Sequence, residues 1–296
     1  MGRKLVAQGN STLMVSLPIG WIKENNLRKG QEVSIKNIGK GLVIAAEKEA
    51  KAEKSLDLRG FSNSFIFIYL TNAFRSGFDR IAIKFEEEKF KLINNIVKSD
   101  LIGFEITKKE NNFCVIESVT EPSEEQFENI LNKLFLSIDN LLEISVIKMK
   151  DFKGDCGDLE EIESLEEQIH RYHNFCRRIL YKKRFSEQKS EFFWTFLSTL
   201  DNAQIEIYNL NKNLKGVKCN KDTIALMEKT KKFFGLIVES YKEKNINCLK
   251  LDEFMEGNKP NIYFSGIKGG ETVAVYYILT CLRLFNLATS PLAGLI

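Results

Sequence analysis

Residues 9–35 read GNSTLMVSLPIGWIKENNLRKGQEVSI, and this stretch decides how the first part of the chain folds. Residues 12–17 are expected to form a short strand that Pro18 ends, because proline cannot donate a ladder hydrogen bond. Residues 19–26 suit two helical turns, with Trp21 facing inward. A turn at Gly30 then leads into the next strand. The stretch predicts a small strand–helix–strand module.

A second hairpin is expected directly after this stretch. Residues 33–38 and 42–46 pair around Gly39 and Gly41, where glycine supplies the positive φ of a tight turn. A core this small does not stabilise a lone chain of about 50 residues. We therefore predict a dimer that shares one core. The apolar side chains that need partners are Leu13, Val15, Leu17, Trp21, Leu27 and Val33.

Charge is unevenly distributed along the chain. Residues 1–54 carry ten Lys or Arg against five Glu, whereas the remaining residues carry 33 basic against 35 acidic side chains. A basic module beside a slightly acidic body is typical of a protein that meets a polyanion at one end.

The second half of the chain has the periodicity of helices. No proline lies between Pro122 and Pro260, and apolar residues recur at helical spacing, as in Phe127, Leu131 and Leu134. The pattern predicts an antiparallel bundle. The expected helices cover residues 127–141, 158–183, 191–214, 221–244 and 270–289, the last one ending before Ser290-Pro291.

Between these parts, residues 56–118 indicate a small α/β segment. Strands are expected at 80–85, 101–107 and 113–118, with a helix at 90–98. Residues 65–70 (FIFIYL) fit a strand by composition and a helix by length. The sequence thus predicts three domains, at residues 1–50, 56–118 and 121–296.

The quoted stretch resembles the swapped-hairpin module of the AbrB/SpoVT family over roughly residues 3–47. The shared marks are a small-residue turn, a strand ending in Leu-Pro, a short helix with Trp21, and a Leu-x-Lys-Gly-x-x-Val turn. The resemblance implies a two-fold dimer of interleaved hairpins that presents a basic face to DNA. It places five side chains nearest that face, namely Arg3, Lys4, Lys23, Arg28 and Lys29.

The whole chain also resembles archaeal proteins that join this module to a PhoU-like helical domain and are known as phosphate uptake regulators. The strings that carry the likeness are GFDRIAIKF, LIGFEITKKENNFCVI, IESLEEQIHRYHNFCRRIL and TSPLAGLI. The resemblance implies a multidomain fold with a carboxyl-terminal all-α bundle. In PhoU-like domains, carboxylate-rich helix stripes can hold metal clusters.

One stripe in this chain could bind a divalent transition metal such as Zn, Fe, Mn or Ni. Glu163, Glu166, His170 and His173 follow one another at i,i+3 and i,i+4 spacing on one helix. The PhoU pattern, however, has Asp where this chain has His170. On the next helix Asp201 is followed four residues later by Ile205, which cannot coordinate metal. A solvated helix face is therefore the favoured interpretation.

Nothing in the sequence indicates an enzyme or a membrane protein. The six cysteines form no C-x-x-C pair, and common nucleophile and zinc-hydrolase motifs are missing. Cys176 and Cys281 sit within apolar helical stretches, where buried thiols are expected. No run of about 18 uncharged apolar residues predicts a spanning helix, so a cytoplasmic protein without a confident cofactor is expected.

The favoured function is a homodimeric, DNA-binding transcriptional regulator whose helical half senses a signal or binds a partner. The link to phosphate uptake rests on the resemblance. The alternative is a signalling scaffold that binds a phosphate transporter or kinase subunit and uses the first module to dimerise. A third hypothesis is an antitoxin-like protein, against which the large helical half argues.

Overall fold

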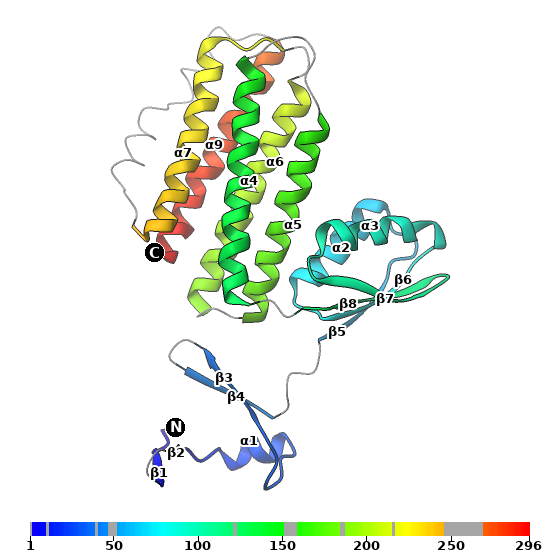
Figure 1. Cartoon of the computed structure of the whole chain (residues 1–296), viewed down its shortest axis with the longest axis vertical. Coiled ribbons are helices and arrows are strands. Elements are labelled where there is room, and N and C mark those ends of the chain that lie inside the picture. Colours follow the sequence, from blue (N-terminus) through cyan, green and yellow to red (C-terminus); the bar gives the residue numbers. More distant parts are fainter. Residues whose placement is uncertain are drawn as a thin grey trace. The chain divides into compact units, whose positions relative to one another are not determined.

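A computed structural model describes residues 2–9, 12–38, 41–46, 52–120, 123–150, 159–183, 187–214, 217–245 and 269–296. The chain divides into two compact units, a small unit (Met1–Lys51) and a large unit (Ala52–Ile296) (Figure 1). The large unit contains both the 56–118 segment and the helices that the sequence analysis assigns to separate domains.

The small unit consists of two hairpins and one short helix. Pro18 stands immediately before the helix, where its fixed φ suits the entry into a first turn, and Gly30 adopts a φ of +87° in the following turn. The expected hairpin over 33–46 is present, while residues 39 and 40 lie outside the described residues. The elements are β1 (Val6–Gln8), β2 (Thr12–Met14), α1 (Ile19–Glu24), β3 (Ser34–Ile38) and β4 (Gly41–Ala45).

The small unit has no core of its own. Among its residues whose burial is described, none is buried, and Leu13 is 64% exposed. Trp21 and Leu27 are only half-buried. Its two sheets have two strands each, an arrangement that is marginally stable at best in water.

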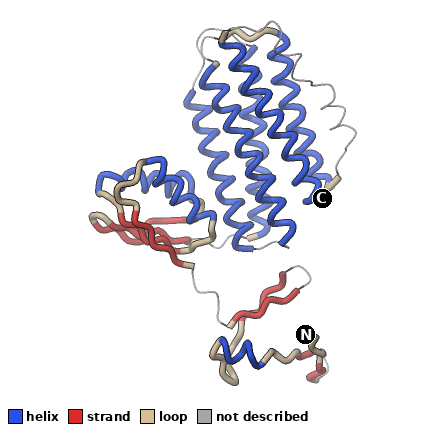
Figure 2. Tube along the Cα trace, turned by 180° about the vertical axis from the view of Figure 1, so that it is seen from behind, coloured by secondary structure: helices blue, strands red, loops and turns tan. Residues whose placement is uncertain are grey.

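The large unit begins with a four-stranded sheet in the order β5-β6-β8-β7. Strands β5 and β6 are parallel and the other neighbours are antiparallel. Helices α2 and α3 lie on one face of the sheet (Figure 2). The elements are β5 (Glu53–Asp57), α2 (Asn63–Arg75), β6 (Arg80–Lys84), the 3-10 turn η1 (Glu87–Lys89), α3 (Phe90–Asp100), β7 (Phe104–Glu110) and β8 (Phe113–Ser118).

For this segment, the structure decides one open alternative and changes one expectation. Residues 65–70 are helical, because Ser62 caps α2 by accepting a hydrogen bond from the Phe65 amide at 3.4 Å. The strand expected from residue 101 begins only at Phe104. Gly103 has a φ of +81° and turns the chain out of α3 before the strand can pair.

The bundle is built from long amphipathic helices. The apolar spacing of α4 buries Leu131, Leu134 and Ile138 as the sequence predicts. Helix α4 packs against α5 and α7, and α6 packs most extensively against α9. The helices are α4 (Glu124–Lys150), α5 (Leu159–Lys183), α6 (Glu187–Asn213), α7 (Lys221–Glu243) and α9 (Gly270–Leu295).

The prediction that the last helix ends before Pro291 is wrong. Helix α9 continues through Pro291, which lacks the amide that would bond to the preceding turn. Burial of Pro291, Leu292 and Leu295 offsets the lost hydrogen bond. Within the described residues, α9 alone is long and apolar enough to cross a membrane by composition. Its Phe285 packs on Phe234 of α7, which makes α9 a core helix of the bundle.

Arg178 joins the α/β layer to the bundle. From α5, its Nη1 donates to the carbonyls of Phe74 (2.9 Å) and Phe78 (2.8 Å), and its Nη2 donates to Asp79 at 2.6 Å. Cations are favoured at a helix carboxyl terminus, which is where Phe74 lies. Gly77 (φ +76°) permits this approach, since a Cβ there would meet the ring of Tyr181 at 2.7 Å.

Replacing Arg178 with Met should lower the free energy of unfolding by about 1–3 kcal/mol, because the carbonyls of Phe74 and Phe78 would lose their buried donor, while Lys182 would still pair with Asp79 at 2.5 Å. Urea denaturation of the full chain measures the loss. Arg59→Met is the matched control, since the Arg59–Asp57 pair is exposed and should matter little. Equal midpoints for the two variants would contradict the structural role of Arg178.

Candidate functional site

The five basic residues expected to face DNA are all exposed in the small unit. Arg3 Nη1 donates to the Ser16 hydroxyl at 3.3 Å, across the hairpin that β1 and β2 form. Lys23 lies on α1, and Arg28 and Lys29 lie in the turn that Gly30 completes. The backbone amide of Arg28 donates to Gln31, which orders this turn. The cations are therefore free to approach an anionic surface.

The stripe on α5 is not a solvated face, and that interpretation is wrong for its histidines. His173 is buried and His170 is half-buried, while Glu163 is exposed and Glu166 half-buried. Asp201 of α6 completes the arrangement. We call Glu166, His170, His173 and Asp201 the histidine–aspartate cluster.

The cluster is held by short polar contacts between α5 and α6. His170 Nε2 lies 3.2 Å from Glu166 Oε1, and His170 Nδ1 lies 3.4 Å from Asp201 Oδ1. The other oxygen of Asp201 lies 3.4 Å from His173 Nδ1. His173 Nε2 lies 2.7 Å from the carbonyl of Leu197. Asp201 thus contacts both histidines of the chain.

The two histidines have opposite protonation behaviour. Burial favours the neutral ring of His170, but the carboxylates of Asp201 and Glu166 outweigh it and raise the pKa of His170. Complete burial lowers the pKa of His173 to about 3. Although burial opposes ionisation of Asp201, the histidines and Arg177 hold the pKa of that carboxyl well below its usual range. The cluster therefore favours a protonated His170 beside a neutral His173 and an ionised Asp201.

Neutral His173 leaves one polar atom without a good partner. Its Nε2–H donates to the Leu197 carbonyl, so Nδ1 carries a lone pair that faces the Asp201 carboxylate. Nδ1 of His173 and Oδ1 of Asp201 have no hydrogen-bond partner despite their burial. His173 Nδ1 and Asp201 Oδ2 face each other at 3.4 Å as two buried acceptors, which is unfavourable.

Helices α2 and α3 contribute charged and polar neighbours that the sequence analysis missed. Arg75 of α2 donates to Asn174 at 2.7 Å. From α5 itself, Arg177 donates to Ser198 at 2.6 Å and stacks on Trp194. Asp100 of α3 is buried, and burial raises the pKa of its carboxyl. The only sequence signal for this neighbourhood was Asp201 on the next helix.

The described residues do not support the metal-binding alternative for Glu163, Glu166, His170 and His173. No group of three or more His, Cys, Asp or Glu in the described part of the chain has the arrangement of a metal site. Glu163 is exposed, and His170 directs both ring nitrogens at the carboxylates of Glu166 and Asp201.

The structure confirms the expected buried thiols at Cys176 and Cys281 and also buries Cys114 and Cys219. All four thiols are free. Burial raises the pKa of Cys114 to about 12, so its thiol is not a nucleophile at neutral pH. Cys156 and Cys248 lie outside the described residues.

Because the chain has only two histidines, proton NMR can test their states directly. One ring resonance should titrate above the ordinary value near 6.5, and the other should stay unprotonated until about pH 3. His170→Gln assigns the first resonance by removing it. If both resonances titrate near pH 6.5, the cluster is not assembled as described.

The raised pKa also fixes the sign of a stability effect. The pKa of His170 is higher in the folded than in the unfolded chain, so His170 makes its full contribution to the free energy of unfolding below about pH 6.5. That contribution falls as the pH rises through the folded-state pKa. The difference in unfolding free energy between wild type and His170→Gln should shrink on that alkaline side. A difference that grows with pH would contradict it.

Comparison with known proteins yields a match for the small unit. Residues 6–52 match the family model described as antidote-toxin recognition MazE, bacterial antitoxin. Neither the curated proteins nor the solved structures yield a match. The match covers β1 to β4 and ends before the sheet of the large unit and the bundle. The chain therefore begins with a MazE/AbrB-like module, which is of the DNA-binding antitoxin or regulator type, followed by a mostly helical part.

Proposed function

We propose that this protein is a dimeric, DNA-binding transcriptional regulator whose large unit adjusts the binding of its small unit to DNA. The observation that carries the proposal is the MazE-like small unit, with five exposed basic side chains and no buried side chain among those described. Such a unit needs a second copy to complete its core, and its exposed cations suit an anionic partner.

Dimerisation follows from the apolar surface of the small unit. Leu13, Ile19 and Leu42 are each well over half exposed, on or beside different elements. Burying one such side chain contributes roughly 1.5–3 kcal/mol. A second copy that covers these residues would supply the core that one copy lacks, and it would double the number of cations on the assembly.

DNA suits the charges that remain. Arg3 and Arg28 can each donate two parallel hydrogen bonds to a phosphate, and Lys residues add mobile point charges. Contacts of this kind set affinity and position on the duplex and carry no sequence information by themselves. The proposal therefore predicts salt-sensitive binding, and it puts the protein in the cytoplasm.

The regulated pathway is proposed from the resemblance to archaeal phosphate uptake regulators. In this proposal the bundle acts as a PhoU-like sensor or binds a phosphate transporter or signalling protein. Fragments from upstream of phosphate-transporter genes should compete with unrelated genomic fragments in a gel shift. If both kinds of fragment compete equally, the proposed link to phosphate uptake is wrong, while the proposal of a DNA-binding regulator stands.

The family match also favours a second candidate, an antitoxin. The matched family is described by toxin recognition, so a toxin would be the partner of the chain. Co-expression with the product of the neighbouring gene distinguishes the two, because an antitoxin should restore growth and co-purify with that product. A regulator of the first kind should do neither.

Leu13→Glu should dissociate the dimer of the full chain in sedimentation velocity experiments, because it places two charges in the shared core. Leu136→Glu is the matched control, since Leu136 of α4 is 61% exposed against 64% for Leu13. The control should remain dimeric. A Leu13→Glu variant that is still dimeric would show that the dimer forms through another surface.

Affinity for genomic DNA fragments should fall by about 10³–10⁵-fold between about 50 and 200 mM salt if roughly 6–10 phosphates are contacted. Arg3→Ala with Lys4→Ala should flatten this slope, as measured by fluorescence anisotropy. The control pair, Lys133→Ala with Lys232→Ala, removes two exposed cations of the bundle and should leave the slope unchanged. If no DNA binds at low salt, the scaffold function replaces the regulator.

A further inference from the structure

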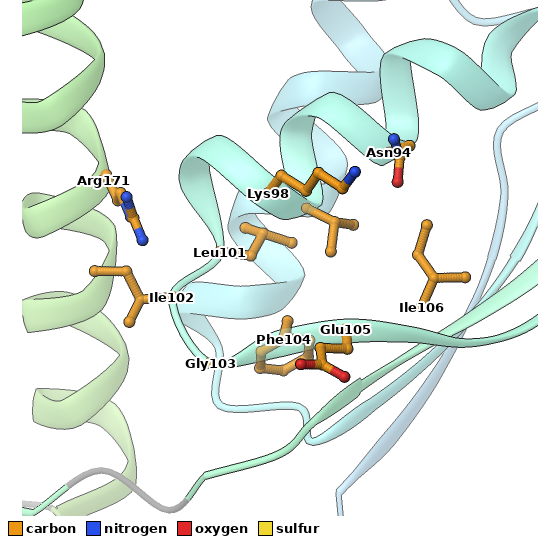
Figure 3. A pocket seen from close by; sticks show the side chains of 10 residues that line it. Asn94, Lys98, Leu101, Ile102, Gly103, Phe104, Glu105, Ile106 and Arg171 are labelled. Atoms are coloured by element: carbon orange, nitrogen blue, oxygen red, sulfur yellow. The ribbon is translucent and has the colours of Figure 1, made fainter.

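A cavity of about 470 Å³ lies between α3, β7 and the middle of α5. Figure 3 shows Lys98 and Asn94 on α3 and Glu105 on β7, with Arg171 extending toward the cavity from α5. The volume is within the range of small-molecule sites in proteins. We propose that this α3–β7 cavity binds a small organic anion with an apolar part.

The apolar part is indicated by the wall of the cavity. Val97, Leu101 and Phe104 are buried core residues that also line it, and Ile102 and Ile106 are half-buried beside them. Ile102 and Ile106 still present apolar surface to water, and a ligand that covers them removes it, at roughly 25 cal/mol per Å². An inorganic ion offers no such surface.

The anionic part is indicated by two cations that lack partners. Lys98 and Arg171 are exposed, and neither makes an ion pair or hydrogen bond with another described residue. The neighbouring arginines differ, since Arg75 donates to Asn174 and Arg177 to Ser198. Glu105 is the one carboxylate of the lining, so the cavity keeps a net positive charge.

A carboxylate or a phosphate monoester suits either cation. The guanidinium of Arg171 matches either group in a two-bond geometry, and Lys98 adds a donor that can rotate. The amide of Asn94 can bond to a polar substituent. Glu105 repels the anion, so removing the charge of Glu105 should strengthen binding of the anion. The same change should weaken binding of a ligand that carries an ammonium group.

The cavity adjoins the histidine–aspartate cluster. Arg171 follows His170 on α5, and Asp100 of α3 precedes Leu101 in the cavity wall. The charge of Arg171 acts on Asp100, as does that of His170. An anion that engages Arg171 would therefore alter the charges at the contact between α3 and α5, which gives the ligand a route to the junction of the sheet with the bundle.

Isothermal titration of the full chain tests the site with two probes, phenyl phosphate and phenylacetate. Benzyl alcohol lacks the charge and inorganic phosphate lacks the apolar part. We expect both aromatic anions to bind, more tightly than either control compound. The tighter of the two identifies the headgroup as phosphate or carboxylate. Absence of binding by both at millimolar concentration would overturn the proposal, as would equal binding of benzyl alcohol.

Variants locate the binding. Arg171→Gln with Lys98→Gln should weaken the aromatic anions by about tenfold or more, since each change removes a charge-assisted hydrogen bond. Lys133→Gln removes an exposed cation of α4 and should have no effect. Glu105→Gln should tighten binding. Unchanged affinity in the double variant, or weaker binding in Glu105→Gln, would overturn the site or the charge assigned to its ligand.

Discussion

Burying a guanidinium is costly unless its donors find partners, and Arg178, with only 1% of its side chain exposed, meets this constraint at the carboxyl end of α2. Two carbonyls and the Asp79 carboxylate accept hydrogen bonds from Arg178, and the rings of Phe74 and Phe104 lie against its guanidinium. This contact fixes α2 against α5. The approach of Arg75 to Asn174 and of α3 to Arg171 both depend on that position, so the histidine–aspartate cluster and the cavity depend on it too.

Much of the fold follows from local sequence. Periodic apolar residues and Pro or Gly boundaries located the bundle helices and most strands, because these signals act within a few turns. Strand β5 was missed because it reads EKSLD, and only Leu56 of it is buried. Helix α9 was predicted too short because burial of Leu292 and Leu295 outweighs the hydrogen bond that Pro291 lacks. Packing of this kind cannot be inferred from a single helix pattern.

The candidate sites were predictable only in part, for a related reason. Helical spacing correctly placed His170 and His173 on neighbouring positions of one helix, but spacing does not show which side a neighbouring layer covers. Arg75 stands 99 residues before Asn174, and Asp100 comes from yet another helix. The exposure of Arg3 and Lys23 was easier to predict, since charged side chains of a module this small have nowhere to be buried.

The pairing of α6 with α9 has a consequence for synthesis of the chain. The two helices share the most extensive contact in the described structure, yet α6 ends at Asn213 and α9 begins only at Gly270. At about 5–20 residues per second, roughly 4–16 s pass between translation of the end of α6 and that of the end of α9. During that interval the face of α6 that α9 later covers lacks this partner. The nascent bundle therefore exposes an aggregation-prone apolar surface until late in translation. Ribosomal pausing before α9 would favour aggregation over folding.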